Sequence, residues 1–232
     1  MSVANSPHDK AAELKVAMAE LISAAGSIDV SLTLLVADII HMPFPMPDLE
    51  LASVIVFSQT SVERQIDVVR KIIAMRLSAG LAGKPHEFPR KACDFILKAF
   101  NLTAADTTRD LWMRNLAAHG TLYFSGERVT LVPSPVDFDG IRKLHIKRKQ
   151  PSESLLVPNN GLTTCELNEA RVHYNSLHDR YAKIREATKL AMTDQFTEAL
   201  EATLRELGRD LKLQAPLRVR PHRERRQPKQ PK

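Results

Sequence analysis

The sequence has few cysteines and few aromatic residues. Cys93 and Cys165 are the only cysteines, and they lie far apart without a C-x-x-C pair. We therefore expect neither a disulfide framework nor a cysteine-based zinc site, which suits a reducing cytoplasm. Aromatic residues make up 5% of the chain and hydrophobic residues 44%, so the predicted core consists mainly of Leu, Ile, Val and Ala. A chain of 232 residues is long enough to bury such a core.

We also expect no segment that directs the chain to a membrane. No basic start is followed by an apolar run and a small-residue cleavage site, so we expect no secretory signal. The longest apolar stretch, residues 28–42, is short for a membrane-spanning helix and carries Asp29 and Asp38. These features predict a cytoplasmic protein without a membrane partner.

The excess of positive charge is confined to the end of the chain. The net charge is +6, from 33 Lys and Arg against 27 Asp and Glu. Residues 216–232 contain seven of the basic residues and one acidic residue, so residues 1–215 hold 26 of each sign. The high pI is therefore weak evidence for a basic surface on the folded part, and we expect a disordered basic tail at 216–232.

The spacing of hydrophobic residues predicts a mainly α-helical domain over residues 1–215. Ser6 is the expected N-cap of the first helix, and Gly26 is expected to interrupt or kink it before the apolar segment. Thr60 and Glu63 have the spacing of a capping box for a helix over residues 61–77.

A small β-hairpin is predicted after a helix that contains the most informative motif. Thr103 with Asp106 predicts the start of this helix, and Gly120 is expected to end it in a left-handed conformation. The hairpin, with its insertion, should occupy about residues 121–149, and residues 141–149 could form a third extended segment.

A long helix is predicted to begin with a second capping box, Thr163 with Glu166. Apolar residues follow a 3-4 spacing for almost three heptads, which fits either a coiled coil facing a partner or a core helix of the bundle. These residues are Leu167, Ala170, Tyr174, Leu177, Tyr181 and Ile184. The sequence after Thr193 extends this helix or begins another.

Arg114, Asn115 and His119 form the pattern R-N-x-x-x-H directly before Gly120. From the composition, about 0.02 matches to this pattern are expected by chance. The segment resembles the R-N-x-x-x-H motif of the HEPN superfamily, which comprises helical domains that include metal-independent endoribonucleases acting as dimers. The resemblance covers residues 8 to about 120 and 164–191, and it leaves the hairpin and the tail unexplained. It implies a HEPN-like helical bundle with Arg114, Asn115 and His119 as catalytic residues.

Helix geometry indicates that one copy of the motif is a poor active site. Asn115 and His119 should lie about 40° apart on one helix face, with Arg114 about 140° from His119 and about 7.5 Å along the axis. Two copies facing across a two-fold axis would bring two imidazoles and two guanidiniums to one phosphate. Histidine moves protons near neutral pH and arginine binds phosphate through paired hydrogen bonds. The RNA 2′-hydroxyl would be the nucleophile, so we expect no metal and no cofactor.

Other interpretations of the same residues remain open. A histidine followed by glycine is a normal helix C-terminus, and Arg114 could pair with Asp110 one turn earlier. Arg171 and His178, a second arginine–histidine pair, are expected on a solvated face. Trp112 and Leu116, also one turn apart, favour core or dimer-interface packing over a platform for base stacking.

One basic cluster lies in the otherwise neutral part of the chain, within the segment 141–149. Such a cluster could bind RNA phosphates, or it could be an exposed edge strand protected by lysines. The candidate RNA-binding residues are Arg142, Lys143, Lys147, Arg148 and Lys149.

The sequence thus predicts a homodimeric, metal-independent endoribonuclease, with RNA and a possible antitoxin or regulatory protein as partners. The resemblance alone suggests toxin–antitoxin systems or antiviral defence. The alternative is a non-catalytic helical module that binds RNA, a nucleotide or a partner protein.

Overall fold

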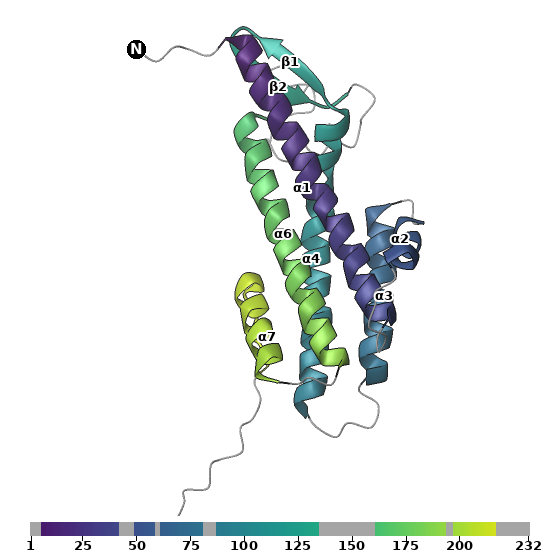
Figure 1. Ribbon diagram of the computed structural model, residues 1–232. Helices are drawn as coiled ribbons and strands as arrows, with labels where there is room; N and C mark the ends of the chain where they lie inside the picture. The colour runs from purple at the N-terminus through teal and green to yellow at the C-terminus, as the bar shows by residue number, and fades with distance from the viewer. Residues whose placement is uncertain are drawn as a thin grey trace, which may run out of the picture.

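Three long helices lie side by side and form the body of the molecule. The computed structural model of the chain describes residues 6–41, 49–58, 61–80, 87–134, 161–193 and 197–216. Its long helices are α1 (Pro7–His41), α4 (Glu87–His119) and α6 (Thr164–Met192) (Figure 1). The predicted mainly α-helical fold with a small β-hairpin is confirmed.

Three shorter helices complete the described part of the bundle. Helices α2 (Leu49–Phe57) and α3 (Val62–Gly80) pack against α1, and α3 also contacts α4 and α6. Helix α7 (Glu198–Leu211) packs against α6 and α4. It begins after Thr197 as a separate helix and does not extend α6. The basic tail after Pro216 lies outside the described residues.

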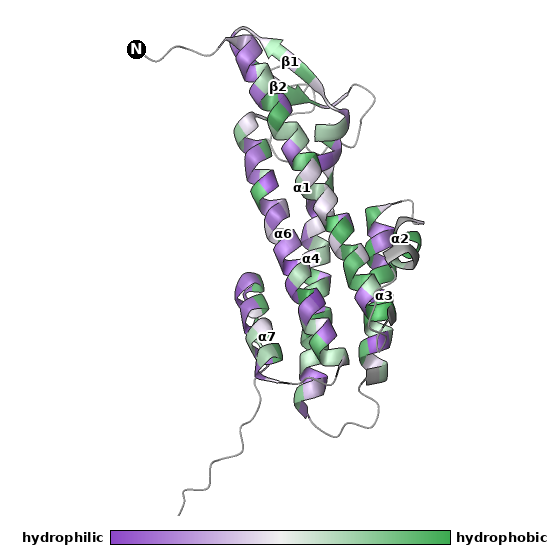
Figure 2. Cartoon of the chain, in the orientation of Figure 1, coloured by the Kyte–Doolittle hydropathy of each residue, from purple (hydrophilic) through white to green (hydrophobic). Residues whose placement is uncertain are grey.

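Helix α6 contributes the central stripe of the hydrophobic core. All six residues of its predicted 3-4 pattern are buried, and Leu177, Tyr181 and Ile184 are fully enclosed. Helices α1, α4, α3 and α7 all pack on α6. In Figure 2, hydrophobic residues are dense on the second half of α1, while α6 carries polar and apolar residues in alternation. The pattern is therefore that of a core helix in its own chain.

The apolar character of α1 follows from its central position. By length and composition alone it could cross a membrane, and 56% of its most apolar window is buried inside the bundle. Its fully buried residues include Leu14, Leu21, Leu32 and Leu35.

The helix boundaries differ from the expected ones at two places. Helix α1 continues through Gly26. Helix α4 likewise continues through Thr103, whose buried hydroxyl donates a hydrogen bond to the Ala99 carbonyl oxygen at 2.9 Å. Thr103 satisfies its hydroxyl within the helix in this way and does not start it.

The N-caps were predicted correctly for α1 and α6. The Ser6 hydroxyl accepts a hydrogen bond from the Asp9 amide at 3.2 Å, and Thr163 forms a complete capping box with Glu166. For α3, the Ser61 hydroxyl accepts a hydrogen bond from the Arg64 amide at 3.3 Å, whereas the expected cap Thr60 lies outside the described residues.

The hairpin lies at the end of the bundle where α4 ends and α1 begins (Figure 1). Strands β1 (Thr121–Ser125) and β2 (Arg128–Val132) pair antiparallel, with Tyr123 opposite Thr130. The turn between them uses Gly126 at a φ of 59°, a conformation that favours glycine. The possible third extended segment, residues 141–149, lies outside the described residues.

Ion pairs on both sides of α6 connect it to its neighbours. Arg180 binds Asp106 of α4 at 2.8 Å, and Arg185 binds Asp38 of α1 at 2.6 Å. Arg171, expected on a solvated face, forms an ion pair with Glu20 of α1.

His178 was also expected on a solvated face, and this was wrong. It lies half-buried against α1, with Nδ1 2.7 Å from the Ser31 hydroxyl. The apolar stripe of α6 faces the core. Polar residues beside this stripe contact the neighbouring helices, His178 and Arg185 on α1 and Arg180 on α4.

Substitution of Leu177 should reveal the role of the α6 stripe. We expect Leu177→Ala to lower the free energy of unfolding by about 2 to 5 kcal/mol, because it opens a cavity in the core. Urea unfolding followed by circular dichroism measures this. The matched control Val172→Ala removes an apolar side chain that is 62% exposed on the same helix, and its effect should stay below about 0.5 kcal/mol. Equal effects of both substitutions would contradict the packing described here.

Candidate functional site

The R-N-x-x-x-H motif lies at the C-terminal end of α4. His119 is the last residue of the helix and its side chain is exposed. The Gly120 amide donates a hydrogen bond to the Leu116 carbonyl oxygen at 2.7 Å, and strand β1 begins at Thr121. Gly120 is therefore the only residue between His119 and the hairpin.

Gly120 ends the helix for a reason other than the one expected. Among the described glycines, only Gly126 has a positive φ. A Cβ atom on Gly120 would lie 2.5 Å from the Leu116 carbonyl oxygen and 2.8 Å from Cδ1 of Leu131. Glycine is needed here because the chain passes this close to its own helix and to β2.

The motif residues are divided between two faces of α4. Asn115 and His119 are exposed and four residues apart, so they share the outer face. Arg114 follows Thr103 and Thr107 at helical spacing, and these two threonines are buried. Arg114 therefore extends toward the interior, on the side of α4 that faces α1 and α6.

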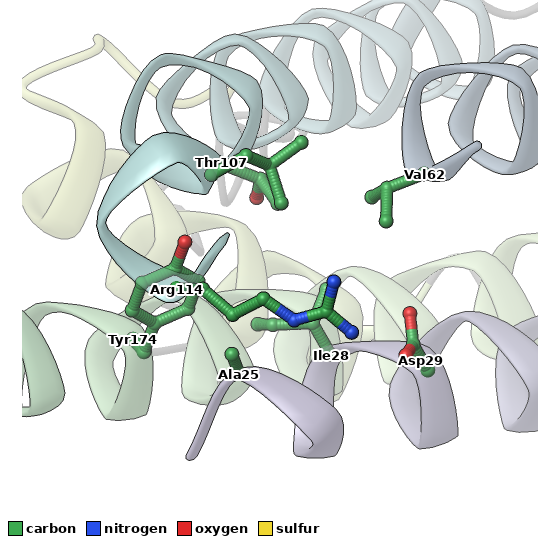
Figure 3. Close-up of a pocket in the computed structure, with 8 residues that line it drawn as sticks. Ala25, Ile28, Asp29, Val62, Thr107, Arg114 and Tyr174 are labelled. Carbon is green, nitrogen blue, oxygen red and sulfur yellow. The ribbon is translucent and has the colours of Figure 1, made fainter. Parts of the chain in front are cut away.

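Arg114 lies in a small cavity between α1, α3, α4 and α6. In Figure 3 its side chain extends past Ala25 and Ile28, and its guanidinium is directed at the carboxylate of Asp29. Thr107, Tyr174 and Val62 also line this cavity. Its volume is about 10 Å³, which is close to the room that one water molecule needs.

Arg114 also contacts the outer face. Its Nη1 donates a hydrogen bond to Oδ1 of Asn115 at 3.2 Å. The guanidinium thus lies between the exposed Asn115 and the half-buried Asp29.

Burial influences two ionisable groups in the cavity. Burial raises the pKa of Asp29 above its ordinary value of 3.8, and the nearby Arg114 guanidinium partly offsets this effect. Burial also raises the pKa of Tyr174, an effect that Asp110 increases and Arg114 reduces. Within the described part of the chain, the buried Tyr174 hydroxyl has no hydrogen-bond partner. The cavity is therefore a polar site with unused hydrogen-bonding capacity.

Arg114 does not pair with Asp110 in the described part of the chain. Oδ2 of Asp110 lies 3.0 Å from Nε2 of His173 on α6 and 3.4 Å from a guanidinium nitrogen of Arg109. Asp110 thus contributes to the contact between α4 and α6, and Arg114 faces Asp29 of α1 instead.

Trp112 and Leu116 lie beside the motif and pack against the core. Leu116 is fully buried, and Trp112 is half-buried against the hydrophobic cluster. This arrangement fits the packing role that the sequence suggested for them.

The other candidate site residues are not described by the structure. The basic cluster Arg142, Lys143, Lys147, Arg148 and Lys149 falls within residues 135–160, which lie outside the described ranges. No group of three or more His, Cys, Asp or Glu side chains that could bind a metal ion occurs in the described ranges.

Asp29, Thr107 and Tyr174 are the site residues that the sequence analysis missed. One signal was present, because Asp29 is a charged residue within an apolar helical stretch and a buried charge needs a partner. The identity of that partner depends on the rotation of α1 relative to α4, which a sequence does not specify.

The raised pKa of Asp29 leads to a pH-dependent prediction. Its folded-state pKa lies above the unfolded value, so the stability of the folded chain falls as the pH rises through this range. Asp29→Asn removes this loss, and we expect it to gain stability over the wild type at about pH 7 and to match it at about pH 3.5. Urea unfolding at both pH values measures the difference.

Asp9 provides a contrasting control for this prediction. Hydrogen bonds from Ser6 lower the pKa of Asp9, so Asp9→Asn should lose stability at neutral pH. A loss of stability for Asp29→Asn at neutral pH would mean that burial does not raise the pKa of Asp29.

The chain was compared with protein-family models, with curated proteins and with solved structures, and none of them matches. The central feature of the site is an exposed Asn115–His119 pair, connected through Asn115 to a guanidinium that points inward.

Proposed function

We propose that the protein is a metal-independent endoribonuclease of the HEPN type that acts as a homodimer in the cytoplasm. The observation that supports this best is the exposure of Asn115 and His119 on one face at the end of α4, with Arg114 hydrogen-bonded to Asn115. His119 supplies a proton carrier and Arg114 a cation for the phosphate, which are the functions that RNA cleavage without a metal uses, and Asn115 adds an amide hydrogen-bond donor.

The proposed reaction is a transesterification. One His119 removes the proton from an RNA 2′-hydroxyl, and the oxygen attacks the adjacent phosphorus. The bond to the 5′-oxygen breaks, and the His119 of a second copy donates a proton to that oxygen. The products are a 2′,3′-cyclic phosphate and a 5′-hydroxyl end. Asn115 and Arg114 would stabilise the negative charge that develops on the phosphate.

The homodimer is part of the proposal because one copy offers a single imidazole for two proton transfers. A two-fold axis near the end of α4 would supply the second one. The basic residues Arg142 to Lys149 and the tail are proposed to contact RNA phosphates, which would make binding sensitive to salt. A role in toxin–antitoxin systems or antiviral defence, with an antitoxin or regulator as partner, remains part of the proposal.

The second candidate is a non-catalytic helical module that binds RNA, a nucleotide or a protein. The observation that favours it is the inward direction of Arg114 toward Asp29. A guanidinium that only stabilises the bundle would leave an exposed histidine and asparagine without a partner for phosphate chemistry.

Cleavage of RNA in EDTA distinguishes the two candidates. We expect the wild type to cut a single-stranded RNA and His119→Ala to be about 100- to 10,000-fold slower, the usual contribution of a general acid or base. His8→Ala is the matched control, because His8 is an exposed histidine in the first turn of α1. Undiminished cutting by His119→Ala would remove His119 from the mechanism, and no cutting by the wild type would favour the non-catalytic module.

Subunit mixing tests the shared site. His119→Ala is expected to be nearly inactive as a homodimer. Exchange of its subunits, in excess, into the wild-type dimer should lower the activity of the wild type, because the mixed dimer retains one imidazole for two proton transfers. The measurement is cleavage rate against mixing time, with sedimentation to verify the dimer. A chain that sediments as a monomer at micromolar concentration and still cuts RNA would contradict the shared site.

A further inference from the structure

The guanidinium of Arg114 is directed at Asp29 of α1, although it also donates a hydrogen bond to Asn115 at the edge of the outer face. It shares the inward face with the buried Thr107, while His119 is on the outer face. A phosphate bound at His119 could be contacted by Arg114 only after the arginine side chain turns outward. We therefore looked for the group that holds the Arg114 side chain in the inward position when no RNA is bound.

Asp29 is the group that favours the inward position. Its carboxylate faces the guanidinium across the cavity and interacts with its charge. The buried hydroxyl of Tyr174 lines the same cavity and has no hydrogen-bond partner within the described ranges. A water-sized space surrounded by a carboxylate, a guanidinium and a hydroxyl is a polar environment that suits an arginine side chain.

The interaction is of a kind that a substrate can displace. Arg114 and Asp29 do not form a direct ion pair, in contrast to Arg180 and Asp106, which lie 2.8 Å apart in the described structure. Arg114 is half-buried and already has one hydrogen bond to the exposed Asn115. Phosphate offers a guanidinium two parallel charged hydrogen bonds, which are stronger than an attraction across a water-sized gap.

We propose that Asp29 is a positioning residue that holds Arg114 away from His119 until an RNA phosphate draws the guanidinium outward. The inference rests on the proposed ribonuclease function and adds a restraint on the same site. The resting chain would then be a poor nuclease, and binding of the phosphate would complete the site.

The restraint can be tested without any activity, through the chemical reactivity of Arg114. Phenylglyoxal modifies accessible arginines, and mass spectrometry of peptides gives the rate at each position. We expect Arg114 to react slowly in the wild type and about two- to fivefold faster in Asp29→Asn, the range for a partly exposed charge pair. The exposed Arg128 serves as the reference in each sample.

Three further variants make the test specific. Asp38→Asn removes the same type of carboxylate from the same helix, away from the cavity, and should leave Arg114 slow. Asp29→Glu retains the charge and should also leave it slow. Asp29→Ser is a second neutral variant, so that the result does not depend on a single substitution. Slow modification of Arg180, which pairs with Asp106, verifies that each variant is folded.

The outcomes separate the restraint from the proposed function. Equal rates for Arg114 in the wild type and in the folded neutral variants overturn the restraint, whatever the nuclease activity. Faster modification together with about two- to fivefold faster RNA cleavage supports both proposals. Faster modification without cleavage in any variant supports the restraint and overturns the nuclease. Slower cleavage in the neutral variants would mean that Asp29 assists Arg114, which also overturns the restraint.

Discussion

The burial of one stripe of α6 is the constraint on which the rest of the structure depends. The stripe from Leu167 to Ile184 is enclosed by α1, α4, α3 and α7, so these four helices are oriented by their contacts with a single helix. The hydrophobic effect provides the free energy for this arrangement without specifying direction. Aromatic residues are few, and Tyr174 and Tyr181 are the largest side chains that α6 places in the core.

The apolar stripe does not determine how far α6 is shifted along its neighbours, and ion pairs between the helices do. Arg180 with Asp106 and Arg185 with Asp38 set α6 in register with α4 and α1. A shift of α6 by one residue would separate these charges and leave them partly buried without partners, which is costly. The same register brings Asp29 of α1 opposite Arg114 of α4, so the geometry of the candidate site follows from the packing of the bundle.

Local features were predictable from the sequence, and contacts between helices were not. The hairpin, the Thr163–Glu166 capping box and the buried pattern of α6 depend on residues that are close in sequence, and all three are present. Gly26 and Thr103 looked like helix interruptions, but packing against neighbouring helices outweighs their weak local preferences. The division of the motif between two faces follows from helix geometry, whereas the partner of Arg114 depends on how two helices rotate against each other.

Gly120 joins α4 to the hairpin without an intervening loop. The chain turns from the helix into β1 within this single residue, whose space is limited by Leu116 and Leu131. Strand β2 is in turn bonded to Leu162, just before α6, by two backbone hydrogen bonds of 2.8 and 2.9 Å. Because Gly120 is the only residue between His119 and β1, the hairpin and the start of α6 together fix the backbone position of His119. The end of α4 is therefore held from two directions, by its own helix and by the strands.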